Sequence, residues 1–582
     1  MPPTSSASSL APPVSVNPEC RVDVEKAAAA QSDVRCEAER TYLGSGTADD
    51  PYVVDWDLND PEDPYNWPST FKWIITAQLA LCTFTVSFGS SAYAGGIFYT
   101  IRDFGISDSV ATLGISLYVL GFALGPLVWA AMGEMYGRRP VFLVTSFLYA
   151  AFQLQGALSR NIATLLSCRL LTGIFGASPL TNSGGTIGDI FNFRERGLAS
   201  AIYATVPFLG PVIGPIVGGF VAENPRLGWH FNFWLMFIFS TVSLFAGYFI
   251  TPETYAPVLL RKRAGRLYRE SNKTVHFVSL HDQKKEAKTL AGLMRKNLSR
   301  PFVFIATEPI VLLVAIYSSI MYGTLYALFS AFPIVFQLHR GFTPGQGGLA
   351  FVGVGLGIFM GTASQTLQNK IYWRIMDNSE TGRAPPEARL HMAIVGAVLS
   401  PIGLWWFAWT SQPSIHWAAP IVAGIPFGTG ISQILQSLTT YLMDTYTIYF
   451  ASAISATVVL RSICGAVFPL FSPALFKSLG DQWAMSVFAA LLTVCMPIPI
   501  LFWKYGPRIR SKSRHAFFED DLSAARGDTT FVSSQTGHTM CERGAVGVGI
   551  VNSDSNHSTQ VATPTPPKKR PMPWPKTFIV PA

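Results

Sequence analysis

The sequence contains twelve stretches of roughly twenty apolar residues, all between Lys72 and Lys504. A helix of about that length crosses the roughly 30 Å hydrocarbon core of a membrane. Because lipid offers the backbone no hydrogen-bond partner, each stretch must satisfy its own peptide groups, and a helix does so. The stretches run over approximately 73–95, 110–131, 140–158, 162–182, 198–221, 232–251, 305–333, 347–366, 391–410, 417–438, 451–472 and 483–503.

The order of these stretches and the composition predict the fold class. The chain is 49% hydrophobic and 13% charged, where a typical soluble domain has about 25% charged residues. Six stretches precede a long basic segment and six follow it, so we expect an all-α membrane protein with twelve transmembrane helices in two six-helix halves. The expected boundaries are 1–72 for a disordered N-terminal tail, 73–251 for the N-terminal half, 252–304 for a central loop, 305–504 for the C-terminal half and 505–582 for a disordered C-terminal tail.

The distribution of lysine and arginine predicts the orientation. Residues 261–300 alone contain twelve lysines and arginines. The loops that alternate with the basic loops contain few lysines and arginines. Basic loops stay on the cytosolic side, so we expect the central loop and both termini in the cytosol, and the first stretch is preceded by no cleavable signal pattern. The net charge of +8 then reflects loops near anionic lipid, and no nucleic-acid partner is expected. Charges at helical spacing around Asp282 to Lys296 predict an amphipathic surface helix.

The loop over residues 133–140 combines glycine with charge. Gly133 and Gly137 suit a tight turn between two helices. Glu134 followed by Arg138 and Arg139 forms a charge cluster that can pair in one conformation and separate in another. The alternative is a positive-inside anchor, which accounts for the arginines but not for Glu134.

Several charged residues lie inside or at the ends of the apolar stretches. Arg169 lies within the fourth, and a buried arginine in a membrane usually faces a cavity or a carboxylate. Arg169 therefore has either a functional role or a structural one, in which it only pairs with a neighbouring group. Arg461 lies near the middle of the eleventh stretch. Three acids lie near the cytosolic ends of the fourth, seventh and tenth stretches, where each is either functional or a satisfied helix-end charge: Asp189, Glu308 and Asp444.

The fifth stretch is rich in proline and glycine. Prolines at 207, 211 and 215 remove backbone donors inside a helix. Glycines at 210, 214 and 218 share one helical stripe, where a neighbouring backbone can approach closely. A helix that both bends and packs tightly suits a moving bundle; the alternative is an ordinary kinked helix.

These motifs resemble the major facilitator superfamily, specifically the twelve-span drug:proton antiporters of fungi. The loop at 133–140 is similar to the family's G-x-L-A-D-R-x-G-R-K signature, with Ala130 for the first glycine and Glu134 for the aspartate. The run 169–176 is similar to its span-4 arginine motif. The resemblance covers the chain from about Asp55 to Gly506. The G-x-x-x-G-P-x-x-G-G motif of antiporters is matched by Gly210, Gly214, Pro215, Gly218 and Gly219. Similar fungal patterns are Asp60-Pro61, Tyr65-Asn66-Trp67-Pro68, Pro252-Glu253-Thr254-Tyr255 and Arg300-Pro301-Phe302.

The resemblance implies roles for these residues. Arg169 is expected to tune proton coupling through its field on a nearby carboxyl group, with Glu308 and Asp444 as candidates. Residues 210–219 are expected to act as a hinge, so that the halves rock around a midplane site. A cytosolic gate is expected from Glu134, Gly137, Arg138, Arg139 and Asp189.

Candidate substrate contacts come from physical reasoning alone. Tyr322, Tyr326 and Phe329 form an aromatic stripe at helical spacing, which either lines a cavity or packs against another helix. An aromatic, weakly polar cavity suits amphiphilic organic compounds. The polar partners that we expect are Asn182, Gln433, Gln436 and Arg461.

Other activities find no support in the sequence. Gly353, Gly355 and Gly357 resemble a dinucleotide fingerprint but lie within an apolar stretch, where they predict close helix packing. No Walker, Ser-His-Asp, HExxH or clustered Cys/His pattern occurs. We expect no enzyme activity, no metal and no cofactor, with the proton gradient as the energy source.

The leading hypothesis is a multi-pass plasma-membrane exporter. It would exchange protons for a hydrophobic or amphiphilic molecule, either a xenobiotic drug or a secondary metabolite of the same cell, and would work in the lipid bilayer as a monomer. One alternative is a carrier for a small charged solute such as a polyamine or an organic acid. A more distant alternative is a membrane sensor that does not transport, suggested by the roughly 75-residue C-terminal tail.

Overall fold

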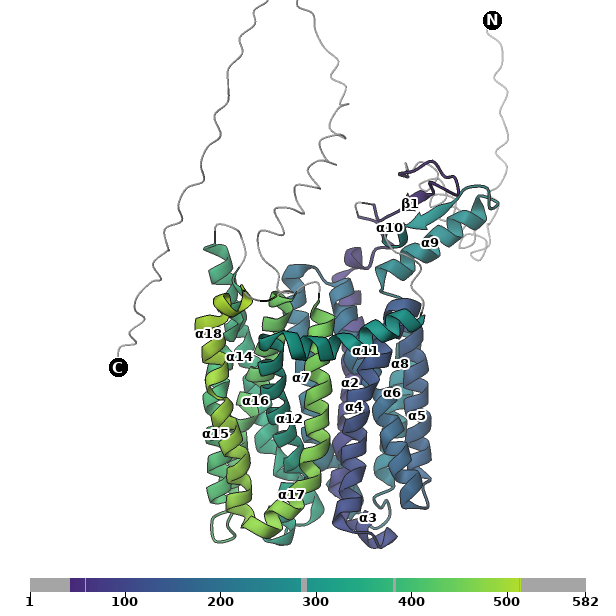
Figure 1. Ribbon diagram of the computed structural model, residues 1–582. Coiled ribbons are helices and arrows are strands. Elements are labelled where there is room, and N and C mark those ends of the chain that lie inside the picture. Colours follow the sequence, from purple (N-terminus) through teal and green to yellow (C-terminus); the bar gives the residue numbers. More distant parts are fainter. Residues whose placement is uncertain are drawn as a thin grey trace, which may run out of the picture. The chain divides into compact units, whose positions relative to one another are not determined.

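The computed structural model of the chain describes residues 42–57, 59–283, 290–379, 384–446, 449–511 and 513. Long helices that run side by side make up most of this part of the chain (Figure 1). The elements of the first half are β1 (Tyr52–Val54), η1 (Pro64–Asn66), α2 (Ser69–Ser91), η2 (Ala92–Gly96), α3 (Ile97–Phe104), α4 (Asp108–Tyr136), α5 (Arg138–Ala157), α6 (Ile162–Ile190), α7 (Phe193–Glu223) and α8 (Phe231–Ile250). A central segment follows, with α9 (Ala256–Glu270), β2 (Phe277–Ser279), α10 (Leu280–Gln283) and α11 (Leu290–Thr307). The second half contains α12 (Pro309–Phe332), the π-helix η3 (Pro333–Leu338), α13 (Pro344–Leu349), α14 (Phe351–Asp377), η4 (Pro386–Leu390), α15 (His391–Thr410), α16 (Ala418–Thr445), α17 (Phe450–Cys495) and α18 (Pro497–Arg510).

The helices agree with the twelve predicted spans. Eleven helical segments of the described residues are long and apolar enough to cross a membrane, and the last of them, Ser452–Arg510, is 59 residues long. Gly480 interrupts it with φ 76° and ψ 167°, which is not a helical conformation. A positive φ of this size favours glycine. The chain therefore turns at Gly480, and the segment supplies two spans, which makes twelve.

The two halves meet along two seams. α4 packs against α17, and α7 packs against α13 and α14. Large apolar side chains remain exposed on the outside of the bundle, among them Phe249 (79% exposed) and Val494 (77%). A soluble protein rarely exposes large apolar patches, whereas lipid covers such side chains at no cost. The exposed rings thus agree with a membrane-embedded bundle.

A small folded unit lies beside the helices and corrects one expectation. Residues 1–72 were expected to be disordered, but β1 pairs in parallel with β2 of the central segment, with Tyr52 opposite Phe277. Val54, Leu260 and Leu267 share an apolar cluster at this contact. The prediction was wrong over residues 42–72, because strand pairing over more than two hundred residues is invisible to local composition; residues 1–41 lie outside the described part.

A buried ion pair holds this unit together. Arg263 Nη1 lies 2.6 Å from Asp60 Oδ2, and the two side chains are 3% and 1% exposed. The nearby pair of Arg266 and Glu62, at 3.1 Å, is 46% exposed on both sides. Desolvation makes the buried pair costly to break by removing one partner, whereas water screens the exposed pair. Asp60 thus anchors the segment before the first span to α9.

The predicted amphipathic helix around Asp282 to Lys296 is found only in part. α10 ends at Gln283 and α11 begins at Leu290, and the residues between them lie outside the described ranges. Figure 1 shows α11 running across the spans rather than along them. It contacts both α4 and α17 and leads directly into α12. The helix therefore connects the two halves at one end of the bundle.

We expect the Asp60→Ala variant to release β1 from β2, because the buried Arg263 would lose its 2.6 Å carboxylate partner while Glu62 stays at 3.7 Å, at a local cost of about 3 kcal/mol. Hydrogen exchange of the peptides over Tyr52–Val54 and Phe277–Ser279 measures the release. Glu62→Ala is the control, since its pair with Arg266 is exposed and its 3.7 Å contact with Arg263 is longer than that of Asp60, so its loss should cost less than the loss of Asp60. Equal exchange in the two variants would contradict the anchoring role of Asp60.

Candidate functional site

A charged cluster lies at the end of the bundle where α11 crosses, which we call the basic end. Arg138 begins α5 after Gly137, whose φ of 103° permits the abrupt turn from α4. The Arg138 guanidinium bonds to Asp189 Oδ2 at 3.3 Å and to Asn182 Oδ1 at 3.1 Å, both on α6. It also lies 5.1 Å from the centre of the Tyr255 ring. The cluster ties α5 to α6.

Glu253, which no sequence argument singled out as a site residue, completes this cluster. Its carboxylate accepts hydrogen bonds from the backbone N–H groups of Arg138 (2.9 Å) and Arg139 (3.3 Å), the first two residues of α5. It also accepts from the N–H groups of Thr254 and Tyr255. A buried carboxylate at a helix N-terminus satisfies orphan donors and opposes the positive end of the helix dipole. An acid directly after Pro252 at the end of the sixth span was the available signal.

The pairing of Glu134 with Arg138, predicted for one conformation and not for another, is not formed in this conformation. Among the hydrogen bonds and ion pairs of the described residues, none joins Glu134 to Arg138. Glu253 instead occupies the space next to Gly137, where a Cβ atom would overlap its carboxylate. Burial raises the pKa of Tyr255 to about 12, and the charge of Glu134 contributes to that rise.

The second half repeats the arrangement at the same end. Arg389 Nε lies 2.9 Å from Asp444 Oδ2, and its Nη1 donates to Asn369 Oδ1 at 3.3 Å. Asp444 ends α16 as Asp189 ends α6. Of the two interpretations left open for Asp444, this geometry favours the paired helix-end charge.

Glu308 occupies the corner between α11 and α12 and is 2% exposed. Its Oε2 accepts hydrogen bonds from the Tyr446 hydroxyl at 2.9 Å and from Ser513 Oγ at 2.6 Å. Burial raises the pKa of Tyr446, and the neighbouring Glu308 charge raises it further. The hydroxyl of Tyr446 therefore remains a donor to this carboxylate. Glu308 is thus a buried acid that accepts from two hydroxyl groups.

Arg169 is buried among carbonyl groups. The side chain is 1% exposed, and its three nitrogens donate to the carbonyl oxygens of Gly114 (2.7 Å), Gly89 (2.7 Å) and Ser90 (3.0 Å). Its guanidinium carbon lies 4.3 Å from the centre of the Tyr118 ring. No ion pair within the described residues joins it to an acid, so the expected neighbouring carboxyl group is absent from its contacts there. Partial charges of backbone carbonyls stabilise the cation instead.

An aromatic and polar path leads from Arg169 to the second half. Ser90, whose carbonyl accepts from Arg169, shares a 3.0 Å hydrogen bond between its Oγ and the Tyr326 hydroxyl. The Tyr322 hydroxyl donates to the Tyr326 hydroxyl at 3.4 Å. The Arg461 guanidinium carbon lies 5.1 Å from the Tyr322 ring centre, and its Nε is buried without a hydrogen-bond partner. A chain of side-chain contacts thus crosses the seam, with a buried arginine at each end: Arg169 and Arg461.

The aromatic stripe on α12 is buried rather than open. Tyr322, Tyr326 and Phe329 are 7%, 0% and 1% exposed. Neighbouring ring centres of the stripe lie 4.9 and 5.1 Å apart, and Phe329 packs at 5.3 Å against Phe351 of α14. In this conformation the stripe forms part of the packed seam between the halves.

Two of the expected polar partners bond elsewhere. Asn182 accepts from Arg138 and therefore belongs to the charged cluster at the basic end. Gln433 donates to Ser364 Oγ at 2.7 Å, between α16 and α14, and its Oε1 has no partner. Gln436 is buried on the same helix. The grouping of Asn182 with the aromatic stripe is thus wrong, because the direction of a side chain depends on how α4 and α5 pack around α6.

The glycine stripe of α7 brings backbones together as its spacing predicts. A Cβ atom at Gly210 would lie 2.6 Å from Ser87 Cβ on α2, and one at Gly214 would overlap Ser91 Oγ. A Cβ atom at Gly218 would overlap the Ala92 carbonyl, and one at Gly219 would overlap the Pro344 carbonyl of α13. α7 stays helical through its prolines. One helix therefore fits tightly against both α2 and the second half.

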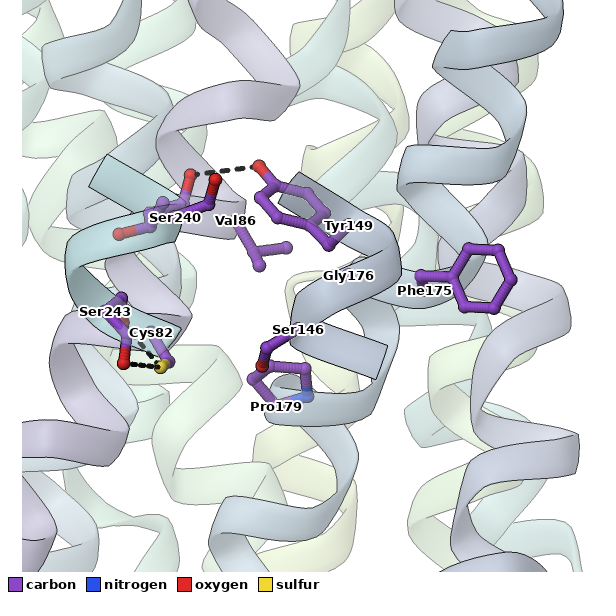
Figure 2. Close-up of a pocket in the computed structure, with 10 residues that line it drawn as sticks. Cys82, Val86, Ser146, Tyr149, Phe175, Gly176, Pro179, Ser240 and Ser243 are labelled. Atoms are coloured by element: carbon purple, nitrogen blue, oxygen red, sulfur yellow. Dashed lines mark hydrogen bonds between the residues drawn. The ribbon is translucent and has the colours of Figure 1, made fainter. Parts of the chain in front are cut away.

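Two small cavities lie between the helices of the described residues. One of about 10 Å³ lies among α2, α5, α6 and α8, where Cys82 and Ser243 share a 2.6 Å hydrogen bond and Tyr149 faces the space (Figure 2). Another of about 10 Å³ lies between Pro215 of α7 and Gly348 of α13. A cavity of this size holds about one water, whereas organic ligands need several hundred Å³. Neither cavity can hold a substrate without movement of the helices.

The described residues contain no cluster of three or more His, Cys, Asp and Glu side chains that could hold a metal ion. Several of their charged groups form ion pairs or cap helices, among them Arg138 with Asp189, Arg389 with Asp444, and Glu253 at the start of α5.

Comparison with known proteins places the chain among membrane carriers. Residues 79–469 match the model of the Major Facilitator Superfamily. The chain is 47% identical over 475 residues to the MFS-type efflux pump MFS2 of Trichophyton rubrum, covering 82% of this chain and 79% of that protein. It is 45% identical over 479 residues to the multidrug transporter mdrA of Aspergillus fumigatus (82% and 78% covered), and 44% identical over 478 residues to the efflux pump FUB11 of Gibberella moniliformis (82% and 80%).

Solved structures agree on the fold. The proton:xylose symporter XylE aligns with a TM-score of 0.55 over 75% of this chain and 96% of its own, at 13% sequence identity. At that identity the likeness shows the fold alone.

We expect the Gly214→Ala variant to be destabilised by about 1–3 kcal/mol, because the new methyl group overlaps Ser91 and forces α7 away from α2. Thermal unfolding of the purified protein measures the loss. Gly197→Ala on the same helix is the control: nothing lies within 4 Å of its Cβ position, and alanine favours the helix. If both variants unfold at the wild-type temperature, the close approach does not stabilise the seam.

Glu253→Ala should weaken the start of α5, since it leaves two N–H groups at the helix N-terminus without their charged acceptor, at about 1.5–3 kcal/mol. Faster hydrogen exchange at the start of α5 and a lower unfolding temperature measure the effect. Glu134→Ala should change both little, since Glu134 makes no ion pair with Arg138. A larger effect from Glu134→Ala than from Glu253→Ala would contradict this prediction and support an ion pair between Glu134 and Arg138.

Proposed function

Because the chain belongs to the major facilitator superfamily, a family of membrane transporters, we propose that it exports hydrophobic or amphiphilic small molecules in exchange for protons. Relatives that share nearly half of its residues over most of its length are named efflux pumps and a multidrug transporter. The substrate would be a drug or a secondary metabolite of the same fungal cell. The membrane would be the plasma membrane, with the basic end and both termini in the cytosol.

The observation that carries the proposal is the close packing of α7 at the contact between the two halves. Its glycines fit the antiporter motif, and they lie directly against α2 on one side and α13 on the other. Glu223, at the end of α7, accepts from the Gly345 N–H of α13 at 3.1 Å. A helix with little side-chain volume between two partners can pivot with few rotamer changes. Residues 210–219 would thus be the hinge on which the halves rock.

The substrate class follows from the path between the halves. When the halves part, Tyr322, Tyr326 and Phe329 would line the new space with aromatic surface, which suits large apolar compounds. Arg169 and Arg461 would place positive charge at its two ends. These charges disfavour a polyamine, and the unpartnered Nε of Arg461 favours compounds that carry an acidic group. An organic-acid carrier is therefore the second candidate.

The proton would be exchanged at the ends of the spans. The middle of the twelve apolar stretches contains no aspartate or glutamate. Asp444 is held by Arg389, whereas Glu308 lies buried at the connection between α11 and α12, where Tyr446 and Ser513 donate to it. A change in the charge of Glu308 would act on both helices at once. Glu308 would therefore carry the proton, and the Arg138–Asp189 and Arg389–Asp444 pairs would hold the gating end of each half in shape.

Export is tested by the accumulation of labelled drugs and metabolites in yeast that lacks its own pumps. Cells that express the protein should accumulate less of at least one compound, and a protonophore should abolish the difference. Arg169→Ala should abolish export, because it leaves three buried carbonyl groups unpaired across the path.

The exposed Arg160→Ala variant is the matched control and should export normally. Accumulation that falls equally with and without the protonophore would contradict proton coupling. If Arg461→Gln spares the export of every acidic compound, the organic-acid alternative fails.

A further inference from the structure

The end of α18 and the residues just after it are bound to the rest of the second half by two contacts. Arg510 binds the Glu387 carboxylate with two nitrogens, each at 3.2 Å. Three residues later, Ser513 Oγ donates to Glu308 Oε2 at 2.6 Å. Ser513 is half-buried, whereas Ser511 is exposed and donates only to the Arg508 carbonyl at 2.9 Å.

Ser513 binds at the connection between α11 and α12. Glu308 separates α11, which crosses the bundle and contacts both halves, from α12, the first span of the second half. Tyr446, which follows α16, donates to the same carboxylate oxygen. Glu308 therefore links the central segment, the end of α16 and Ser513, which follows α18.

The residues around Ser513 have a chemical character of their own. Arg508, Arg510, Lys512 and Arg514 lie around it in the sequence, and an arginine stands at the third position before Ser513, as another does before Ser511. Kinases select substrates largely by complementary charge patterns. A kinase with an acidic substrate groove fits this basic segment.

We propose that Ser513 is a phosphorylation site for a basophilic protein kinase and that its phosphorylation releases the tail from Glu308. In the reaction, Ser513 Oγ attacks the γ-phosphorus of ATP. The new O–P bond forms as the bond to ADP breaks, and the hydroxyl proton passes to the kinase. The product loses the donor to Glu308 and gains a charge of about −1.5 to −2.

This charge cannot return to a buried carboxylate. The kinase reaches Ser513 while the tail is undocked, and the phosphate then keeps the tail undocked by like-charge repulsion and desolvation. The consequence for substrate movement, a freed joint between α11 and α12, rests on the transport function proposed above. The modification and the release of the tail do not.

The modification is tested on the full-length protein in lipid nanodiscs, incubated with ATP and the catalytic subunit of a cyclic-AMP-dependent kinase. Mass spectrometry should find phosphate on Ser513, absent from Ser513→Ala and still present in Ser511→Ala. Phosphate on Ser511 alone, or on neither serine, would overturn the proposal.

The release is tested by hydrogen exchange of the peptide over residues 508–513. Ser513→Glu should exchange about tenfold faster than wild type, since a hydrogen bond to a charged group is lost. Ser511→Glu is the matched control and should exchange at the wild-type rate. In a Glu308→Gln background, Ser513→Glu should add little, because the opposing charge is gone.

Equal exchange in Ser513→Glu and Ser511→Glu, or an undiminished effect of Ser513→Glu in the Glu308→Gln background, would overturn the proposal. These readouts need no substrate, so an unmodified Ser513 and an absence of export are separate failures.

Discussion

A charge inside a membrane protein must find its partners within the protein, and this constraint explains the arrangement of the bundle. Lipid solvates neither a guanidinium nor a carboxylate. Arg169 therefore draws three carbonyl groups from α2 and α4 around itself, and Glu253 collects the N–H groups at the start of α5. Each such charge fixes two or more helices relative to one another. The apolar contacts then fill the space that these charges leave.

The two halves solve the same problem with different residues. In each half an arginine at the start of one span binds an aspartate at the end of the next: Arg138 with Asp189, and Arg389 with Asp444. The last span of each half also reaches back to the start of the third. In the first half it does so through an acid, Glu253, and in the second through a base, Arg510, which binds Glu387. Arg510 thus joins the end of α18 to η4.

Features encoded by local patterns were predictable from the sequence. The twelve apolar stretches gave the spans, the spacing of Gly210, Gly214 and Gly218 gave the face that packs closely, and Gly137 gave the turn before Arg138. Features that depend on residues far apart were not. The pairing of β1 with β2, the binding of Glu253 to α5 and the carbonyl groups around Arg169 all join segments separated by dozens of residues or more. Asn182 was assigned to the wrong group because its helix was known but its neighbours were not.

If the halves rock about α7 as proposed, one end of the bundle opens as the other closes. Distances between paired spin labels test it most directly. One pair, at Leu158 and Leu479, reports the end away from α11, and the other, at Tyr136 and Trp373, reports the basic end; all four side chains are exposed. When substrate or acidic pH shifts the protein between its states, the account predicts that one distance grows as the other shrinks. Two distances that stay constant, or that grow and shrink together, would contradict it.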